Sequence, residues 1–246
     1  MLFYPFGIIN DLLLRFESVF FLIVFWGLVS ANNGAQKSFT YIIAYFFISR
    51  CINEFTMTSH LSVGNVIRKR IKTGALSQYI LKPVNIIAHV YFELLGERGV
   101  VVFFNLIFFG IGLFLLGNVE IISIILFVIN FVFAMTTSIA FNSLLSSYSM
   151  AITYKGDVKN VFNHISHLLS GALVPLSFFP DGIRQVLLFL PFQNMIYGPT
   201  NAFSIHQINN DVLVQLIVSG VWSLVLYFGS KYLWNKSLKK YEAVAI

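Results

Sequence analysis

Long apolar runs separated by short polar gaps dominate the sequence. A helix needs about 20 mostly apolar residues to cross roughly 30 Å of hydrocarbon, and several runs approach or exceed that length. The runs are too long and too uniformly apolar for barrel strands. The pattern therefore predicts helices, which satisfy their own backbone polar groups in lipid. Six spans are predicted, at residues 8–30, 39–58, 99–116, 121–145, 161–178 and 212–230.

The stretch between the second and third spans departs from this pattern. Residues 67–81 (IRKRIKTGALSQYIL) mix basic and apolar side chains, which favours a helix lying at the membrane surface. Gly74 permits a bend within it. The Lys82–Pro83 step ends the helix, because the residue before proline avoids the helical region. A second amphipathic piece over 84–98 then leads into the third span.

Residues 175–199 are also apolar, but four prolines interrupt them. The run 183–190 makes only about 12 Å of helix, too short to cross. A turn and helix start are predicted just before it, with Asp181 capping the free N–H groups. We expect the fifth span to end near Phe179 and a short helix to return into the outer leaflet as a re-entrant hairpin, shielded by protein or water. The residues that define this hairpin are Pro175, Pro180, Asp181, Gly182, Pro191 and Pro199.

Positive charge is distributed unevenly among the gaps. Twelve of the 16 Lys and Arg residues lie between the second and third spans, between the fourth and fifth, and in the tail. Short basic loops stay on the cytoplasmic side during insertion, so both termini are predicted to be cytoplasmic. The net charge of +6 lies beside the spans, where anionic membrane lipid attracts it, and this placement argues against a nucleic-acid partner.

Composition agrees with an integral membrane protein. Hydrophobic residues make up 57% of the chain and charged residues 11%, against roughly 25% charged residues in a soluble domain. The single Cys51 excludes an internal disulfide. We therefore predict one all-α transmembrane domain over residues 1–246.

Charged side chains inside the first two spans are unusual, because each costs roughly 2.5–3.5 kcal/mol at mid-bilayer on insertion scales. Asp11, Arg15 and Glu17 lie in the first span, and Arg50 and Glu54 in the second. The spacing of four residues allows Asp11 to pair with Arg15 and Arg50 with Glu54 on one helix face. Two interpretations remain open: a polar route or gate, and an ion-pair clip that orders the bundle.

No catalytic, cofactor or metal site is predicted. The chain lacks a G-x-x-x-x-G-K-[ST] phosphate loop, so ATP would bind to a separate protein. His164 and His167 share a helix face, but no Cys, Asp or Glu lies at a spacing suited to completing a metal site, which favours interfacial packing. Glu93 and Glu97 are better explained by neighbouring Arg98 and the water interface than by acid–base chemistry.

Short motifs in the two irregular stretches carry a family resemblance. The inner motif is Gly74-Ala75-Leu76 with Leu81-Lys82-Pro83-Val84. The outer motif is Ser170-Gly171-Ala172, Pro175-Leu176, Phe179-Pro180, Leu190-Pro191-Phe192 and Tyr197-Gly198-Pro199, and Trp26 lies near the end of the first span. In this order and topology, the chain resembles the permease subunits of bacterial ABC-2-type exporters over nearly its whole length. An amphipathic helix usually precedes the first span in that family; here only a few residues precede the span, so this helix is missing or the start is truncated.

The resemblance implies a permease that pairs with itself or a sister permease and with two cytoplasmic ATPases, which carry ATP and Mg, in the bacterial cytoplasmic membrane. It also implies that the inner segment docks on the ATPase. The residues concerned are Arg68, Lys69, Arg70, Lys72, Gly74, Leu81, Lys82 and Pro83. The alternative is that these basic residues hold the segment on anionic lipid.

The expected cargo is hydrophobic or amphiphilic (a drug, peptide, lipid or glycan), because no hydrophilic channel lining is evident. The alternative function is that of an ATP-independent channel or membrane scaffold, which would have no nucleotide-dependent partner.

Overall fold

The apolar runs form long helices in the computed structural model, which describes residues 5–33, 39–56, 63, 66–67, 69–71, 73–80, 85–151 and 164–242. All regular elements within these ranges are helical. The α-helices are α1 (Pro5–Asn33), α2 (Phe39–Thr56), α4 (Leu76–Ile80), α5 (Ile86–Glu97), α6 (Gly99–Leu116), α7 (Ile121–Ala151), α9 (Asp181–Phe189), α10 (Tyr197–Asn201) and α11 (Asn210–Glu242). Three 3-10 helices complete the list: η1 (Leu176–Phe178), η2 (Pro191–Asn194) and η3 (Ala202–Ser204).

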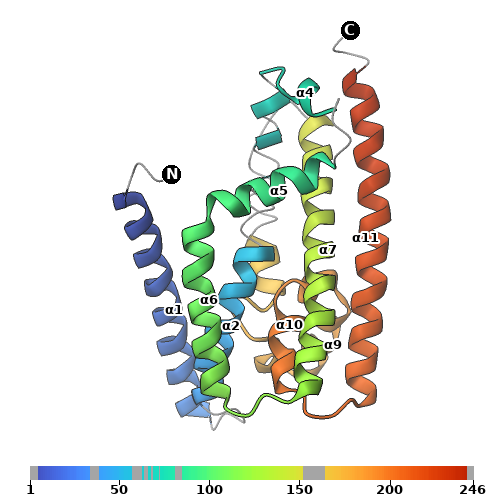
Figure 1. Ribbon diagram of the computed structural model, residues 1–246. Coiled ribbons are helices and arrows are strands. Elements are labelled where there is room, and N and C mark those ends of the chain that lie inside the picture. The colour runs from blue at the N-terminus through green and yellow to red at the C-terminus, as the bar shows by residue number, and fades with distance from the viewer. Residues whose placement is uncertain are drawn as a thin grey trace.

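The long helices α1, α2, α6, α7 and α11 run along roughly one direction (Figure 1). Helix α1 starts and α11 finishes at the same end of the bundle, where α4 and α5 also lie. The short helices α9 and α10 lie toward the other end, between the long helices. The two irregular stretches predicted from the sequence therefore lie toward opposite ends of the molecule.

Within the described residues, three helices are long and apolar enough to cross a membrane, at Gly99–Leu116, Ile121–Tyr148 and Asn210–Lys239. Only 22%, 39% and 17% of their most apolar windows are buried, so most of their surface is left to face lipid. Helix α1 contains a shorter apolar stretch, Phe16–Val29. Helix α11 continues well beyond the predicted span because the polar residues after position 230 are good helix formers, without Gly or Pro.

The predicted fifth span differs from the structure. In the described part of that span, the helix covers 164–169 and then ends in a turn at Ser170 and Gly171, instead of continuing to Phe178. Gly171 adopts a φ of +89°, which favours glycine and ends the helix. The chain then continues through short helices to η3, so the irregular region is longer than the predicted hairpin.

The predicted cap of α9 is also wrong. Pro180 is the N-cap residue, and no side chain bonds to the free N–H groups there. Asp181 lies instead in the first turn, where its charge is favourable near the positive end of the helix dipole. The helix starts early because the Pro180 carbonyl already accepts a hydrogen bond from the Arg184 backbone N–H at 2.9 Å.

Helices α2 and α6 pack closely at Gly112. A Cβ atom at this position would lie 2.7 Å from Ile48 Cγ1 and 3.1 Å from the Ala44 carbonyl oxygen. Such close approach of two backbones is typical of small residues between membrane helices.

We expect Gly112→Leu to force α2 and α6 apart and to destabilise the protein by about 1–3 kcal/mol, the usual cost of overpacking. Gly110→Leu is the matched control, because a Cβ on Gly110 meets no atom within 4 Å. The midpoint of thermal unfolding in detergent measures the stability of both variants. Equal midpoints for the two variants would show that the close contact at Gly112 is not needed.

Candidate functional site

Helix α2 carries a group of polar side chains within an otherwise apolar bundle. Ser49, Arg50, Asn53 and Glu54 lie within two turns, and residues three or four apart share a helix face. Ser49, Asn53 and Glu54 are buried. Polar groups inside a membrane helix bundle are costly and mark functional positions by default.

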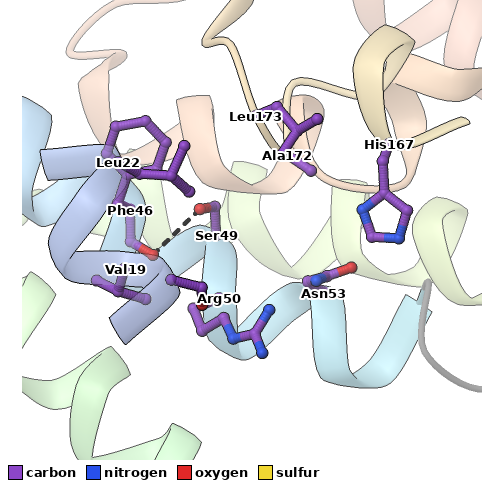
Figure 2. Close-up of a pocket in the computed structure, with 10 residues that line it drawn as sticks. Val19, Leu22, Phe46, Ser49, Arg50, Asn53, His167, Ala172 and Leu173 are labelled. Atoms are coloured by element: carbon purple, nitrogen blue, oxygen red, sulfur yellow. Dashed lines mark hydrogen bonds between the residues drawn. The ribbon is translucent and has the colours of Figure 1, made fainter. Parts of the chain in front are cut away.

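A pocket of about 210 Å³ opens beside these residues. It lies between α1, α2 and the segment 167–173, and Figure 2 shows Arg50 and Asn53 on α2 and His167 on the 164–169 helix around it. Its wall combines this polar group with apolar and small side chains: Ser18, Val19, Leu22, Phe46, Ser49, Ala172 and Leu173. An amphiphile with a hydrogen-bond acceptor or negative charge at one end matches this lining.

The segment 170–173, whose Ala172 and Leu173 line the pocket, is non-helical, and hydrogen bonds from other elements hold it. The Tyr45 hydroxyl donates to the Gly171 carbonyl at 2.8 Å, and the Trp26 indole N–H donates to the Leu173 carbonyl at 2.9 Å. The Tyr197 backbone N–H donates to the Ser170 carbonyl at 2.9 Å. These bonds satisfy backbone groups that would otherwise be left unpaired in an apolar environment.

Glu54 forms an ion pair across two elements. Its carboxylate lies 3.1 Å from an Arg98 guanidinium nitrogen, at the junction of α5 and α6. The Glu54 side chain is 1% exposed and that of Arg98 is 30% exposed. Sequence spacing suggested Arg50 as the partner of Glu54, and Glu93 and Glu97 as the neighbours of Arg98. The structure adds a partner 44 residues away, which helix periodicity cannot indicate.

A second ion pair holds the chain that precedes α5. Arg70 donates to both carboxylate oxygens of Glu93 at 2.8 and 2.9 Å, and its guanidinium lies 4.1 Å from the centre of the Tyr79 ring. The Arg70 side chain is only 13% exposed. We call residues 69–71, 73–80 and α5 the platform. Arg70 is an internal support of this platform.

A hydrophobic core lies behind these contacts. It joins the platform to the end of α11 through eight buried residues: Val63, Ile67, Leu76, Ile86, Ile87, Val90, Tyr91 and Trp234. The Tyr91 hydroxyl also donates to the Phe55 carbonyl at the end of α2. The platform is therefore packed against the bundle, and α5 is linked to the pocket-lining helix α2.

A family model described as ABC-2 family transporter protein matches residues 12–245. The chain belongs to this ABC-2 family. No curated protein shows significant similarity to it. Together with the apolar helices, the family identifies a multi-pass membrane subunit of an ABC transporter, of the kind that generally pairs with ATPase subunits.

The platform of this ABC-2 subunit contains part of the predicted docking segment, whose docking role stays a prediction. Gly74 forms the expected bend with a φ of +72°, and Lys69 is exposed. Arg70, another member of the predicted docking set, contacts Glu93 and Tyr79 within the chain. Five further members of the predicted set lie outside the described residues: Arg68, Lys72, Leu81, Lys82 and Pro83.

The intramembrane charges separate into two groups in the ABC-2 subunit. Glu54 forms the Arg98 ion pair and Arg50 lines the pocket, so the clip and the polar route both stay predictions. Glu17 is exposed on α1. Asp11 and Arg15 lie within α1, but their side chains are outside the described part of the structure.

The hairpin residues divide by burial. Pro175, Pro191 and Pro199 are buried, whereas Pro180, Asp181 and Gly182 at the start of α9 are exposed.

A buried amide cluster anchors this region to α11, and the sequence analysis missed it. Gln193 donates to the Ser219 hydroxyl at 2.9 Å, and Asn194 donates to the Ser219 carbonyl at 3.1 Å. The available signal was a pair of adjacent amides in an apolar, proline-rich stretch, since buried amides require partners.

Arg70→Lys is expected to loosen the platform while changing global stability by about 1 kcal/mol or less, because Glu93 is partly exposed. Lysine keeps the charge but loses the two-point contact and the stacking on Tyr79. Hydrogen–deuterium exchange should be faster in residues 73–80 of the variant. Lys69→Gln is the control with an exposed side chain, and equal exchange in both variants would contradict the supporting role of Arg70.

Proposed function

We propose that this ABC-2 subunit forms the membrane part of an ATP-driven exporter that moves hydrophobic or amphiphilic molecules out of the cytoplasm or the inner leaflet. The main observation that supports this proposal is the pocket, where Arg50 lies among apolar side chains of α1 and α2. A guanidinium in an apolar wall suits a molecule with an acceptor or anionic head and an apolar body.

The partners in this proposal are cytoplasmic ATPases, which bind ATP and Mg, and a second permease copy or a sister permease. The platform end of the bundle faces the cytoplasm of a bacterial cell, as the basic loops favour. The exposed Lys69 and the chain around Gly74 then form the part of the platform that contacts the ATPase.

The contacts suggest how movement at the platform reaches the pocket. Arg70 and Glu93 link residues 69–80 to α5, and Arg98 at the end of α5 pairs with Glu54 on α2. Glu54 lies one helical turn from Arg50. A displacement of the platform by the ATPase would therefore shift α2 relative to α1 and change the shape of the pocket between them.

Transport in proteoliposomes tests the function. We expect ATP-dependent movement of a fluorescent anionic lipid analogue when the ATPase is included, and a Kd for this analogue weakened roughly tenfold in Arg50→Gln through loss of a charged hydrogen bond. An uncharged analogue should be affected much less. Flux that is identical without ATPase and nucleotide would contradict the exporter and favour the channel alternative.

A further inference from the structure

A second cavity of about 300 Å³ lies between α5, α7 and α11, at the platform end of the bundle. It shares no lining residue with the pocket at Arg50. Its walls come partly from α5 and partly from the C-terminal part of α11, and Figure 1 shows α5 in the same half of the bundle as the end of α11. The transport path proposed above makes no use of this cavity.

The cavity lies where a membrane helix leaves the hydrocarbon. Lys231 is the first basic residue of α11 and follows its most apolar part. Trp234 and Tyr227 line the same cavity, and such side chains are enriched at the boundary between lipid and water. The depth of the cavity therefore corresponds to a lipid headgroup and the first part of its acyl chains.

The lining has the polarity that an anionic phospholipid requires. Lys231 is exposed and has no carboxylate partner within the described residues, and the amides of Asn85 and Asn235 lie on the same cavity wall. Among the described residues that line the cavity, none is Asp or Glu. Ile139 and Leu238 supply an apolar surface that a free phosphate would leave uncovered.

The same cavity touches the platform. Tyr79 lines the cavity, and the Arg70 guanidinium lies over the Tyr79 ring. Asn85 lines it and caps α5, because its side-chain oxygen accepts a hydrogen bond from the Ala88 backbone N–H at 3.1 Å. A molecule in this cavity would contact residues 73–80 and α5 of the platform, and also the end of α11.

We propose that this cavity binds one anionic phospholipid of the adjacent leaflet, whose phosphate contacts Lys231 and whose acyl chain packs along α5 and α11, bracing the platform against α11. The leaflet is the inner one in the orientation proposed above. The binding itself requires neither an ATPase nor transport, so its test is independent of the proposed function.

The test uses the whole chain in nanodiscs of phosphatidylcholine with a minor fraction of phosphatidylglycerol. Native mass spectrometry after release from the disc should show one retained phosphatidylglycerol per chain. Lys231→Gln should weaken this retention about tenfold, the effect of losing one charged hydrogen bond. Lys236→Gln is the matched control, because Lys236 is exposed on the same helix but does not line the cavity.

Two further experiments identify the ligand and locate its binding site. A photoactivatable phosphatidylglycerol should label peptides from α5 or α11, and soluble glycerophosphate should not displace it. Equal retention in the two lysine variants, or labelling confined to other helices, would overturn the site. Displacement by glycerophosphate at equal concentration would assign the cavity to a soluble phosphate and overturn the lipid proposal.

Discussion

Replacing Glu54 by alanine is expected to destabilise the subunit by about 3–5 kcal/mol, because removing one partner of a buried ion pair leaves the other charge uncompensated. The Glu54 side chain is almost completely buried, and its carboxylate lies 3.1 Å from Arg98. The loss should appear as a lower unfolding temperature in detergent and a smaller monodisperse fraction on size exclusion.

Two further variants separate the ion pair from other effects. Glu17→Ala removes an exposed carboxylate from α1 and should unfold at the wild-type temperature. The double variant Glu54→Leu with Arg98→Met should recover most of the loss, since replacing both partners of a buried pair by apolar residues is often neutral. If Glu54→Ala unfolds at the wild-type temperature, the pair does not stabilise the contact between α2 and the α5–α6 junction.

Gly171→Ala is expected to have the next largest effect. The φ of +89° is unfavourable for any residue with a Cβ, and the left-handed region costs roughly 1–2 kcal/mol. The added methyl would also lie 2.8 Å from the Tyr45 hydroxyl and 3.1 Å from Tyr197 Cβ, which adds about 1–3 kcal/mol of overpacking. Gly171 directly precedes Ala172 and Leu173, which line the pocket, so ligand binding there should weaken together with stability.

Gly182→Ala is the control for this position. Gly182 lies in the first turn of α9, and a Cβ there meets no atom within 4 Å, so alanine should be neutral or slightly stabilising. Tyr45→Phe removes the hydrogen bond to Gly171 without changing the backbone and should cost about 1 kcal/mol. Equal unfolding temperatures for Gly171→Ala and Gly182→Ala would contradict the strained turn.

The most uniformly apolar helix was the most predictable element. Helix α6 has the predicted bounds, because Arg98 and Gly117 end the apolar run on either side and Gly117 takes a φ of +77°. The amphipathic piece after Pro83 also appears as α5, with Ile86, Ile87 and other apolar side chains buried. These features depend on local composition and periodicity, which the sequence contains directly.

The fifth span could not be predicted in this way. Residues 161–178 are apolar enough for a span, but hydrogen bonds from Tyr45 and Tyr197 to the carbonyls of Gly171 and Ser170 favour a turn there. These partners are distant in sequence. The four prolines indicated an irregular region, without showing where it begins.

The candidate site was predictable in its residue types but not in its contacts. Arg50 and Glu54 were identified by the cost of charge within an apolar span, yet the pocket also needs His167 from a distant segment. Likewise, Arg70 lies in a basic segment that resembles a docking surface. Its contacts with Glu93 and Tyr79 within the chain are visible only in the structure.

The proposed function requires this ABC-2 subunit to work with a separate ATPase. Purification in mild detergent from the native cell, followed by mass spectrometry of the co-purifying proteins, tests it most directly. We expect an ABC ATPase in stoichiometric amount, with less recovered when Lys69 is changed to Glu. A solitary oligomer of this chain, with no ATPase recovered under conditions that keep it folded, would refute the exporter proposal and favour a channel or scaffold.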